Sequence, residues 1–307
     1  MVSKVEELFR RNRRVEMKKD VSDKMHSEVE KDYLGDAFLL FDAFLCAGMA
    51  VALIFAPKQI MDAVLTEESD GVHWHMARCL GSIFMGQAAV CFIWLLLSTD
   101  VTCRSSVIMN RLQASLLGLF ACFKVSPGEA GIPSMTAKGF VWIAGLLFCH
   151  SLIFVCLLGR RKFQIGDALV SPEARSLNAL NQVDSLVATV VGAVWFAMPE
   201  WILYGQVKIV LSGSHIFVSR LFGAYLMATS VHSSRAMYFK TKADHRIWIF
   251  GRSLICAGIL LAQLYSQFAY LQWWTANHWF GIALFSVWST VAFGVFRTEM
   301  LENAHSQ

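Results

Sequence analysis

Eight stretches of about 20 mostly apolar residues divide this chain of 307 residues. A bilayer core about 30 Å thick is crossed by about 20 apolar residues in a helix. Hydropathy therefore predicts eight membrane-spanning helices, at about 34–56, 76–98, 104–124, 138–158, 180–201, 215–237, 246–270 and 276–297. We expect an all-α polytopic membrane protein, because lipid offers no hydrogen-bond partners to an irregular backbone.

The composition supports this fold class. Hydrophobic residues make up 56% of the chain and charged residues 16%, against about 45–50% and about 25% in soluble domains. The net charge of +4 is too small to bind nucleic acid by bulk charge. The eight cysteines lie mostly in apolar runs and form no CxxC pair, so we expect neither a disulfide framework nor a thiolate metal site.

Basic residues are concentrated on one side of the predicted spans. Eight spans place both termini on the same side, which carries nineteen Lys or Arg residues against four on the other. The positive-inside rule predicts that this side is cytosolic. Residues 20–33 can form an amphipathic helix, and the arginine-rich residues 8–14 resemble RxR-type retention signals. This resemblance favours the endoplasmic reticulum.

A single offset of 142 residues relates the two halves of the chain. The pairs at this offset are Asp42 and Asp184, Pro57 and Pro199, Arg78 and Arg220, Gly81 and Gly223, and Arg104 and Arg246. Five matches at one offset predict a duplicated four-helix unit, and an even number of spans per unit makes the copies parallel. The predicted segments are a cytosolic N-terminus at 1–33, repeats at 34–158 and 180–297, a linker at 159–179 and a tail at 298–307.

This architecture, a tandem four-helix membrane unit, resembles the DoxX-type and EXPERA-type families. The resemblance concerns architecture alone. It therefore implies no function for this chain.

Two carboxylates within the spans need partners, because an unpaired charge in hydrocarbon is unfavourable. Asp42 and Asp184 lie toward the cytosolic ends of the first and fifth spans. Arg111 and Arg252 lie at matching depths in the third and seventh. We expect the ion pairs Asp42–Arg111 and Asp184–Arg252, which act as structural struts rather than as a proton relay.

Arg78 and Arg220 begin the second and sixth spans at the predicted non-cytosolic interface. Each can anchor its helix by reaching toward the headgroups, or can hold a lipid phosphate with two parallel N–H donors. Gly81 and Gly223 follow one turn later and leave room for an acyl chain or a neighbouring helix. These four residues are the candidate lipid-headgroup sites.

Polar groups near the bilayer midplane form a second candidate site. Gln87, Gln113 and His150 lie on three different spans of the first half. They can line a small polar pocket, or they can form hydrogen bonds between helices.

Four histidines, His73, His75, His215 and His278, belong to the predicted non-cytosolic face. Imidazole is a common metal ligand, but Trp74 between the first two favours an interfacial anchor, and we expect no metal. The sequence contains no HExxH, Walker A or GxSxG motif. We therefore expect no catalytic residue and no cofactor.

These observations lead to one main hypothesis and two alternatives. The main hypothesis is a non-enzymatic membrane subunit of the endoplasmic reticulum, which works with other membrane subunits and membrane lipids in a lipid-handling or lipid-transfer complex. The first alternative is a small-solute or lipid transporter that uses the midplane groups. The second is a membrane-embedded lipid enzyme.

Overall fold

The computed structural model describes residues 32–98, 100–124, 134–161 and 175–305. The predictions for residues 8–14 and 20–31 lie outside these ranges. The chain divides into two compact units, residues 1–38 and residues 39–307. The packing described below is that of the second unit.

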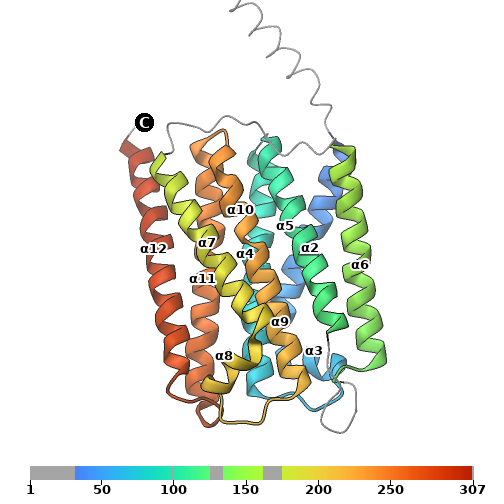
Figure 1. Ribbon diagram of the computed structural model, residues 1–307. Coiled ribbons are helices and arrows are strands. Elements are labelled where there is room, and N and C mark those ends of the chain that lie inside the picture. Colours follow the sequence, from blue (N-terminus) through green and yellow to red (C-terminus); the bar gives the residue numbers. More distant parts are fainter. Residues whose placement is uncertain (1–31, 99, 125–133, 162–174, 306–307) are drawn as a thin grey trace, which may run out of the picture. The chain divides into compact units, whose positions relative to one another are not determined.

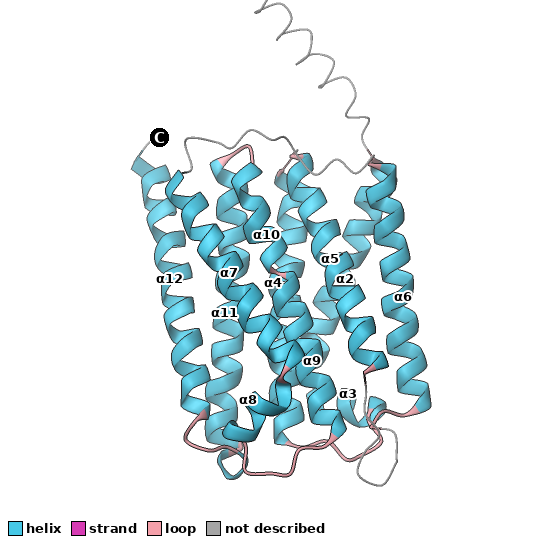
Figure 2. Ribbon diagram, viewed as in Figure 1, coloured by secondary structure: helices cyan, strands magenta, loops and turns pink. Residues whose placement is uncertain are grey.

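The described residues form helices and no named strand (Figures 1 and 2). The long helices are α2 (Tyr33–Phe55), α4 (Gly71–Leu97), α5 (Val101–Phe123), α6 (Ala137–Arg160), α7 (Arg175–Ala197), α9 (Gly213–Ala228), α11 (Lys242–Ala269) and α12 (His278–His305). The short ones are α3 (Pro57–Val64), α8 (Pro199–Gln206), α10 (Ser230–Arg235), η2 (Ala236–Tyr238) and η3 (Leu271–Trp273).

Seven of these helices are long and apolar enough to cross a membrane, namely α2, α4, α5, α6, α7, α11 and α12. The predicted sixth span corresponds to α9 and α10, which Thr229 separates. The described part of the chain is therefore an all-α, multi-pass membrane protein.

Proline determines where two of the spans end. Pro57 and Pro199 are the first residues of α3 and α8, and a proline lacks the N–H that would continue the preceding helix. Accordingly α2 ends at Phe55 and α7 at Ala197. Both short helices lie at the same end of the bundle (Figure 1).

The long helices fall into an inner and an outer group. In α4, α5 and α11 more than half of the span is buried (61%, 56% and 56%), whereas the values for α6, α7 and α12 are 22%, 17% and 28%. The inner helix α4 packs against α9 and α11, and α5 packs against α9. The outer helices α6, α7 and α12 pack against α5, α9 and α11 respectively. Their outer surfaces carry many large apolar side chains, among them Trp142 on α6, Leu186 on α7 and Phe280 on α12.

Each half has a similar backbone contact at the end of the bundle that carries α3 and α8. The chain after α3 pairs with the chain before α6 through Leu65 and Met135, and the chain after α8 pairs with residues before α12 through Val207 and Trp274. Leu65 and Val207 are 142 residues apart. Their partners Met135 and Trp274 are 139 residues apart, so the 142 offset relates one side of these two backbone contacts.

Candidate functional site

The Asp184–Arg252 ion pair lies at the centre of the second half. Arg252 on α11 donates from Nε and Nη2 to Oδ2 of Asp184 on α7, at 2.9 and 2.8 Å. Its Nη1 donates to Oγ1 of Thr229 at 2.9 Å. Ser233 Oγ also donates to Oδ2 of this carboxylate, and Trp288 Nε1 on α12 donates to Oδ1 at 2.8 Å. The carboxylate therefore joins α7, α10, α11 and α12.

The break between α9 and α10 explains why so many polar groups gather here. Thr229 Oγ1 donates to the Leu226 carbonyl at 2.6 Å, which competes with the helical hydrogen bond and bends the helix. Asn110 on α5 donates to the freed Ala228 carbonyl at 2.7 Å, and Ser185 on α7 donates to the Ser230 carbonyl at 3.1 Å. A break within a span persists only when neighbouring side chains satisfy such carbonyls.

His232 on α10 extends this network toward the first half. Its Nδ1 lies 3.0 Å from Ser106 Oγ on α5, and its Nε2 lies 3.0 Å from Gln87 Oε1 on α4. The ring is fully buried and packs against Trp94 and Trp248. His232 thus links α10 to α4 and α5.

The Asp42–Arg111 pair is more enclosed than its counterpart. Arg111 on α5 donates from Nε and Nη2 to the two oxygens of Asp42 on α2, at 2.8 and 2.9 Å. Both side chains are buried, with 5% of Asp42 and 4% of Arg111 exposed. His150 Nε2 on α6 lies 3.5 Å from Asp42 Oδ1. Both expected ion pairs are therefore present, each in a different environment.

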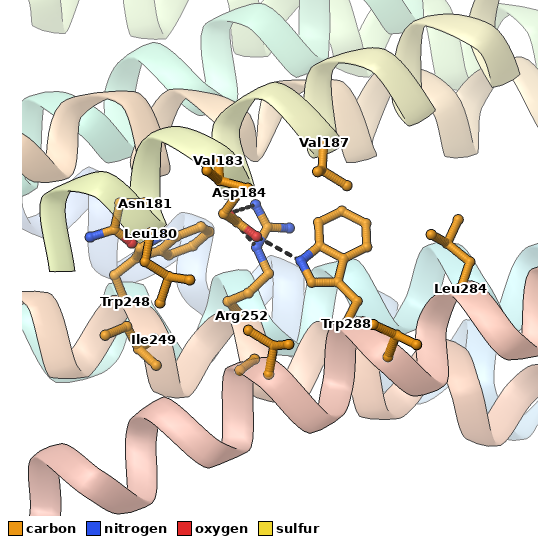
Figure 3. Close-up of a pocket in the computed structure, with 13 residues that line it drawn as sticks. Leu180, Asn181, Val183, Asp184, Val187, Trp248, Ile249, Arg252, Leu284 and Trp288 are labelled. Carbon is orange, nitrogen blue, oxygen red and sulfur yellow. Dashed lines mark hydrogen bonds and ion pairs between the residues drawn. The ribbon is translucent and has the colours of Figure 1, made fainter. Parts of the chain in front are cut away.

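The second pair borders a cavity of about 250 Å³ between α7, α11 and α12 (Figure 3). Apart from Asn181, Asp184 and Arg252, its walls are aliphatic side chains, Trp248 and Trp288. Val183, Val287 and Val291 on its walls are 59%, 65% and 44% exposed on the outer surface. The cavity therefore opens on the outer surface of the bundle, and the ion pair is part of its wall.

Arg78 and Arg220 both bind the carbonyl end of a helix. Arg78 Nε donates to the Ile54 carbonyl near the end of α2 at 3.2 Å, and its Nη1 donates to Tyr270 Oη at 3.3 Å. Its guanidinium also lies over the ring of Tyr265, 4.7 Å from the centroid. Arg220 Nη1 donates to the carbonyl of Lys124, the C-cap of α5, at 3.0 Å. Helix C-termini carry partial negative charge, so both contacts are favourable.

The space beside Gly81 and Gly223 is filled by neighbouring helices. A Cβ at Gly81 would lie 2.9 Å from Ile54 on α2, and a Cβ at Gly223 would meet the backbone of α7 at Gly192 and Phe196. The sequence left two possibilities for the space beside each glycine, an acyl chain or a neighbouring helix. The structure shows a neighbouring helix at both positions, which leaves no room for an acyl chain there.

The three midplane residues do not form one cluster. Gln87 contacts His232 and His150 contacts Asp42. No hydrogen bond within the described residues connects these two contacts to Gln113. The first-half pocket expected from Gln87, Gln113 and His150 is therefore divided between two helix contacts.

Two of the four predicted non-cytosolic histidines meet at the starts of α4 and α9. Asp70, the N-cap of α4, lies 2.9 Å from both His73 Nδ1 and His215 Nε2. Burial raises the pKa of Asp70, but its hydrogen bonds with His215 and His73 outweigh burial and hold the pKa well below its ordinary value. Asp70, His73 and His215 place one potential ligand atom each within 4.8 Å of one another.

His75 and His278 form a separate contact. Their ring centroids are 5.2 Å apart, and Trp274 stacks on His278 at 3.9 Å. His278 Nδ1 lies 2.7 Å from Gln267 Oε1.

Sequence reasoning missed two groups of residues. Ser233 contacts both members of the second ion pair, and Asn110 and Ser185 bind carbonyls at the junction of α9 and α10. The polar run at 229–235 was the available signal for Ser233. The pairing of His73 with His215 was also missed. These two residues differ by the same 142 positions that relate Arg78 to Arg220.

No curated protein matches this sequence. Residues 40–296, which include every long helix except the ends of α2 and α12, match the profile of a domain of unknown function (DUF8292). The chain therefore belongs to the DUF8292 family.

Proposed function

We propose that this protein is a non-enzymatic, multi-pass subunit of the endoplasmic reticulum membrane that assists a lipid-handling or lipid-transfer complex. The observation that carries the proposal is the cavity between α7, α11 and α12. It is mostly apolar, it opens on the outer surface of the bundle, and a charged pair is part of its wall. Apolar pockets with a few placed polar groups are typical ligand sites.

This proposal gives the protein two kinds of lipid contact, one with acyl chains and one with headgroups. An acyl chain occupies the cavity, where Trp288 and the aliphatic walls contact it. Separately, Arg220 on α9 donates from Nη1 to the Lys124 carbonyl, and its remaining donors bind a headgroup phosphate. Arg78 is the weaker headgroup site, because Ile54 and Tyr270 already accept from it.

The proposed topology has eight spans, two parallel four-helix repeats and cytosolic termini. In it, α9 and α10 form one interrupted span, since residues 213–235 rise about 34 Å as a helix. The repeated contacts of Leu65 and Val207 and the repeated proline starts of α3 and α8 support the duplication.

Labelling of introduced single cysteines in sealed microsomes tests this topology. Cysteines placed within residues 1–31 should react with an impermeant reagent from outside, and cysteines within 125–133 should not. Reaction at 125–133 from the same side would contradict eight spans.

Filling the cavity tests the lipid function. Val187→Phe combined with Val291→Phe places two rings in the cavity, and lipid that co-purifies with the protein is then counted by mass spectrometry. We expect fewer bound lipids and no change in the thermal midpoint. Val190→Phe is the matched control, because Val190 is an exposed residue of α7 outside the cavity wall. Equal lipid content in both variants would exclude an acyl chain in the cavity.

One observation favours a transporter as the second candidate. Transporters use broken helices whose freed backbone groups and polar neighbours form the substrate site, and the α9–α10 break is surrounded by such groups. Uptake into proteoliposomes that is abolished by His232→Leu, with lipid binding intact, would favour transport. Purification of the wild-type protein with a stoichiometric partner would favour the subunit.

A further inference from the structure

Five side chains form a closed ring of hydrogen-bond contacts where α4 and α9 begin. The ring runs from Asp70 to His73, Ser214, Ser212 and His215, and back to Asp70. Its five contacts are 2.7 to 2.9 Å long. The imidazole of His73 is 1% exposed and that of His215 is 5% exposed, while 16% of the Asp70 side chain reaches the surface.

The neutral ring has too few protons for its contacts. Two neutral imidazoles carry one N–H each and two serine hydroxyls carry one O–H each, whereas an ionised carboxylate carries none. Four protons therefore serve five contacts. One contact would bring two lone pairs together at hydrogen-bond distance, which is unfavourable in a buried site.

Backbone hydrogen bonds indicate which contact of the neutral ring lacks a proton. The Ser212 N–H donates to His215 Nδ1 at 3.1 Å, so His215 carries its proton on Nε2 and donates to Asp70. The Asp70 N–H lies 3.3 Å from His73 Nδ1, which makes Nδ1 an acceptor as well. That same Nδ1 faces the Asp70 carboxylate at 2.9 Å. In this arrangement the contact between His73 and Asp70 is the one without a proton.

We propose that the Asp70–His73–Ser214–Ser212–His215 ring is a proton-binding site that holds one proton, shared by its two histidines. With that proton, one imidazole becomes a cation with two donors, all five contacts are satisfied, and the cation neutralises Asp70. A second proton is resisted, because the two rings are stacked with centroids 3.8 Å apart and like charges repel at that distance.

The surroundings add little charge to this site. Outside the ring, Glu67 in the loop before α4 is the charged group that interacts electrostatically with His73. From the end of α11, Tyr270 lies against Gly71, and burial raises its pKa above the ordinary value, so it stays neutral. The neighbours of Val72 from α8 and from the segment before α12 are the apolar Leu203 and Trp274.

The ring geometry favours a proton over a metal ion. The two imidazoles are stacked with 29° between their planes. All four of their ring nitrogens already lie at hydrogen-bond distance from an oxygen of Asp70, Ser212 or Ser214.

Proton counting tests the proposal. The detergent-purified protein is treated with EDTA and titrated from about pH 8 to about pH 5, the range in which histidine changes charge. The His73→Gln/His215→Gln double variant supplies the baseline. Gln is an ordinary residue at position N3 of a capping box, where both histidines lie, so the helix starts are retained.

Relative to this baseline we expect one proton for the wild type and one for each single variant. Two protons in the wild type would show independent histidines, and none would show a ring whose charge does not change in this range; either result overturns the proposal. A proton lost in only one single variant would place it on one imidazole and exclude sharing. If the double variant does not fold, ¹⁵N shifts of the wild-type histidines give the same count. Stoichiometric Zn²⁺ binding that His73→Gln abolishes would establish a metal site instead.

Discussion

The two buried ion pairs carry the same charges in different surroundings. Asp42–Arg111 in the first half is enclosed by side chains, and the nearest group from the last helix of that half is His150. Asp184–Arg252 in the second half borders a cavity, and the corresponding helix contributes Trp288. Val183 and Val187 on α7 correspond at the 142 offset to the larger Phe41 and Leu45. The comparison shows that the same pair of charges can be enclosed by side chains or can border a cavity, and that the side chains at 183 and 187 are smaller than those at 41 and 45.

The largest expected effect is at the enclosed pair. Asp42→Asn leaves Arg111 charged and buried, so we expect a loss of about 3–5 kcal/mol in the free energy of unfolding. Asp184→Asn should have a smaller effect, since Thr229 and Ser233 still accept from Arg252. The free energy of unfolding of each variant can be measured in detergent and compared with that of the wild type.

A paired variant checks that these losses come from the unpaired charge. Adding Arg252→Gln to Asp184→Asn should restore part of the stability, because no charge then remains in the low-dielectric interior. Strictly additive losses would mean that the pair is not the origin of the effect.

The break between α9 and α10 should respond less strongly. Asn110→Leu removes the donor to the Ala228 carbonyl, and we expect a loss of about 1–3 kcal/mol for the buried, unsatisfied carbonyl. Gln113→Leu on the same helix is the control. An equal loss in both variants would argue against a role for the freed carbonyl.

The N-caps of α4 and α9 offer a comparison that depends on pH. Asp70 caps α4 and Ser212 occupies the same position before α9, and loss of such a cap costs about 0.5–2 kcal/mol. Because the folded-state pKa of Asp70 is depressed, its ionised form stabilises the fold above the unfolded pKa of about 3.9. That contribution is lost as the pH falls through the folded-state pKa.

We therefore expect Asp70→Asn to lower the thermal midpoint of unfolding at neutral pH. In acid, the midpoints of the variant and the wild type should become equal. Serine has no carboxylate to titrate, so Ser212→Ala should show no such acid convergence. Parallel curves for Asp70→Asn and the wild type down to acid pH would contradict the depressed pKa.

The smallest effect on stability is expected at the two interfacial arginines. Lysine keeps the charge but loses the planar fork of donors, so Arg78→Lys should lower stability by about 1 kcal/mol and Arg220→Lys by less. Bound phospholipid should fall more in Arg220→Lys than in Arg78→Lys, as counted by mass spectrometry. Unchanged lipid in the double lysine variant would leave both arginines as helix caps alone.

The apolar windows and prolines were sufficient to predict the long helices and where several of them end. Seven windows became single helices that can cross a membrane, because hydropathy and proline act locally. The carboxylates also predicted their arginine partners, since a buried charge requires one. Gln87 and His150 contact different partners, His232 and Asp42, because equal depth in a membrane does not place side chains on facing sides of different helices.

The sequence alone thus determined that the chain is helical and multi-pass, and which charges pair. Only the tertiary structure decided that Thr229 separates α9 from α10, that a cavity lies beside Asp184 and that Asp70 joins His73 to His215. Each of these features depends on packing between helices distant in the sequence. The volume left between side chains and the partners of a freed carbonyl are properties of that packing.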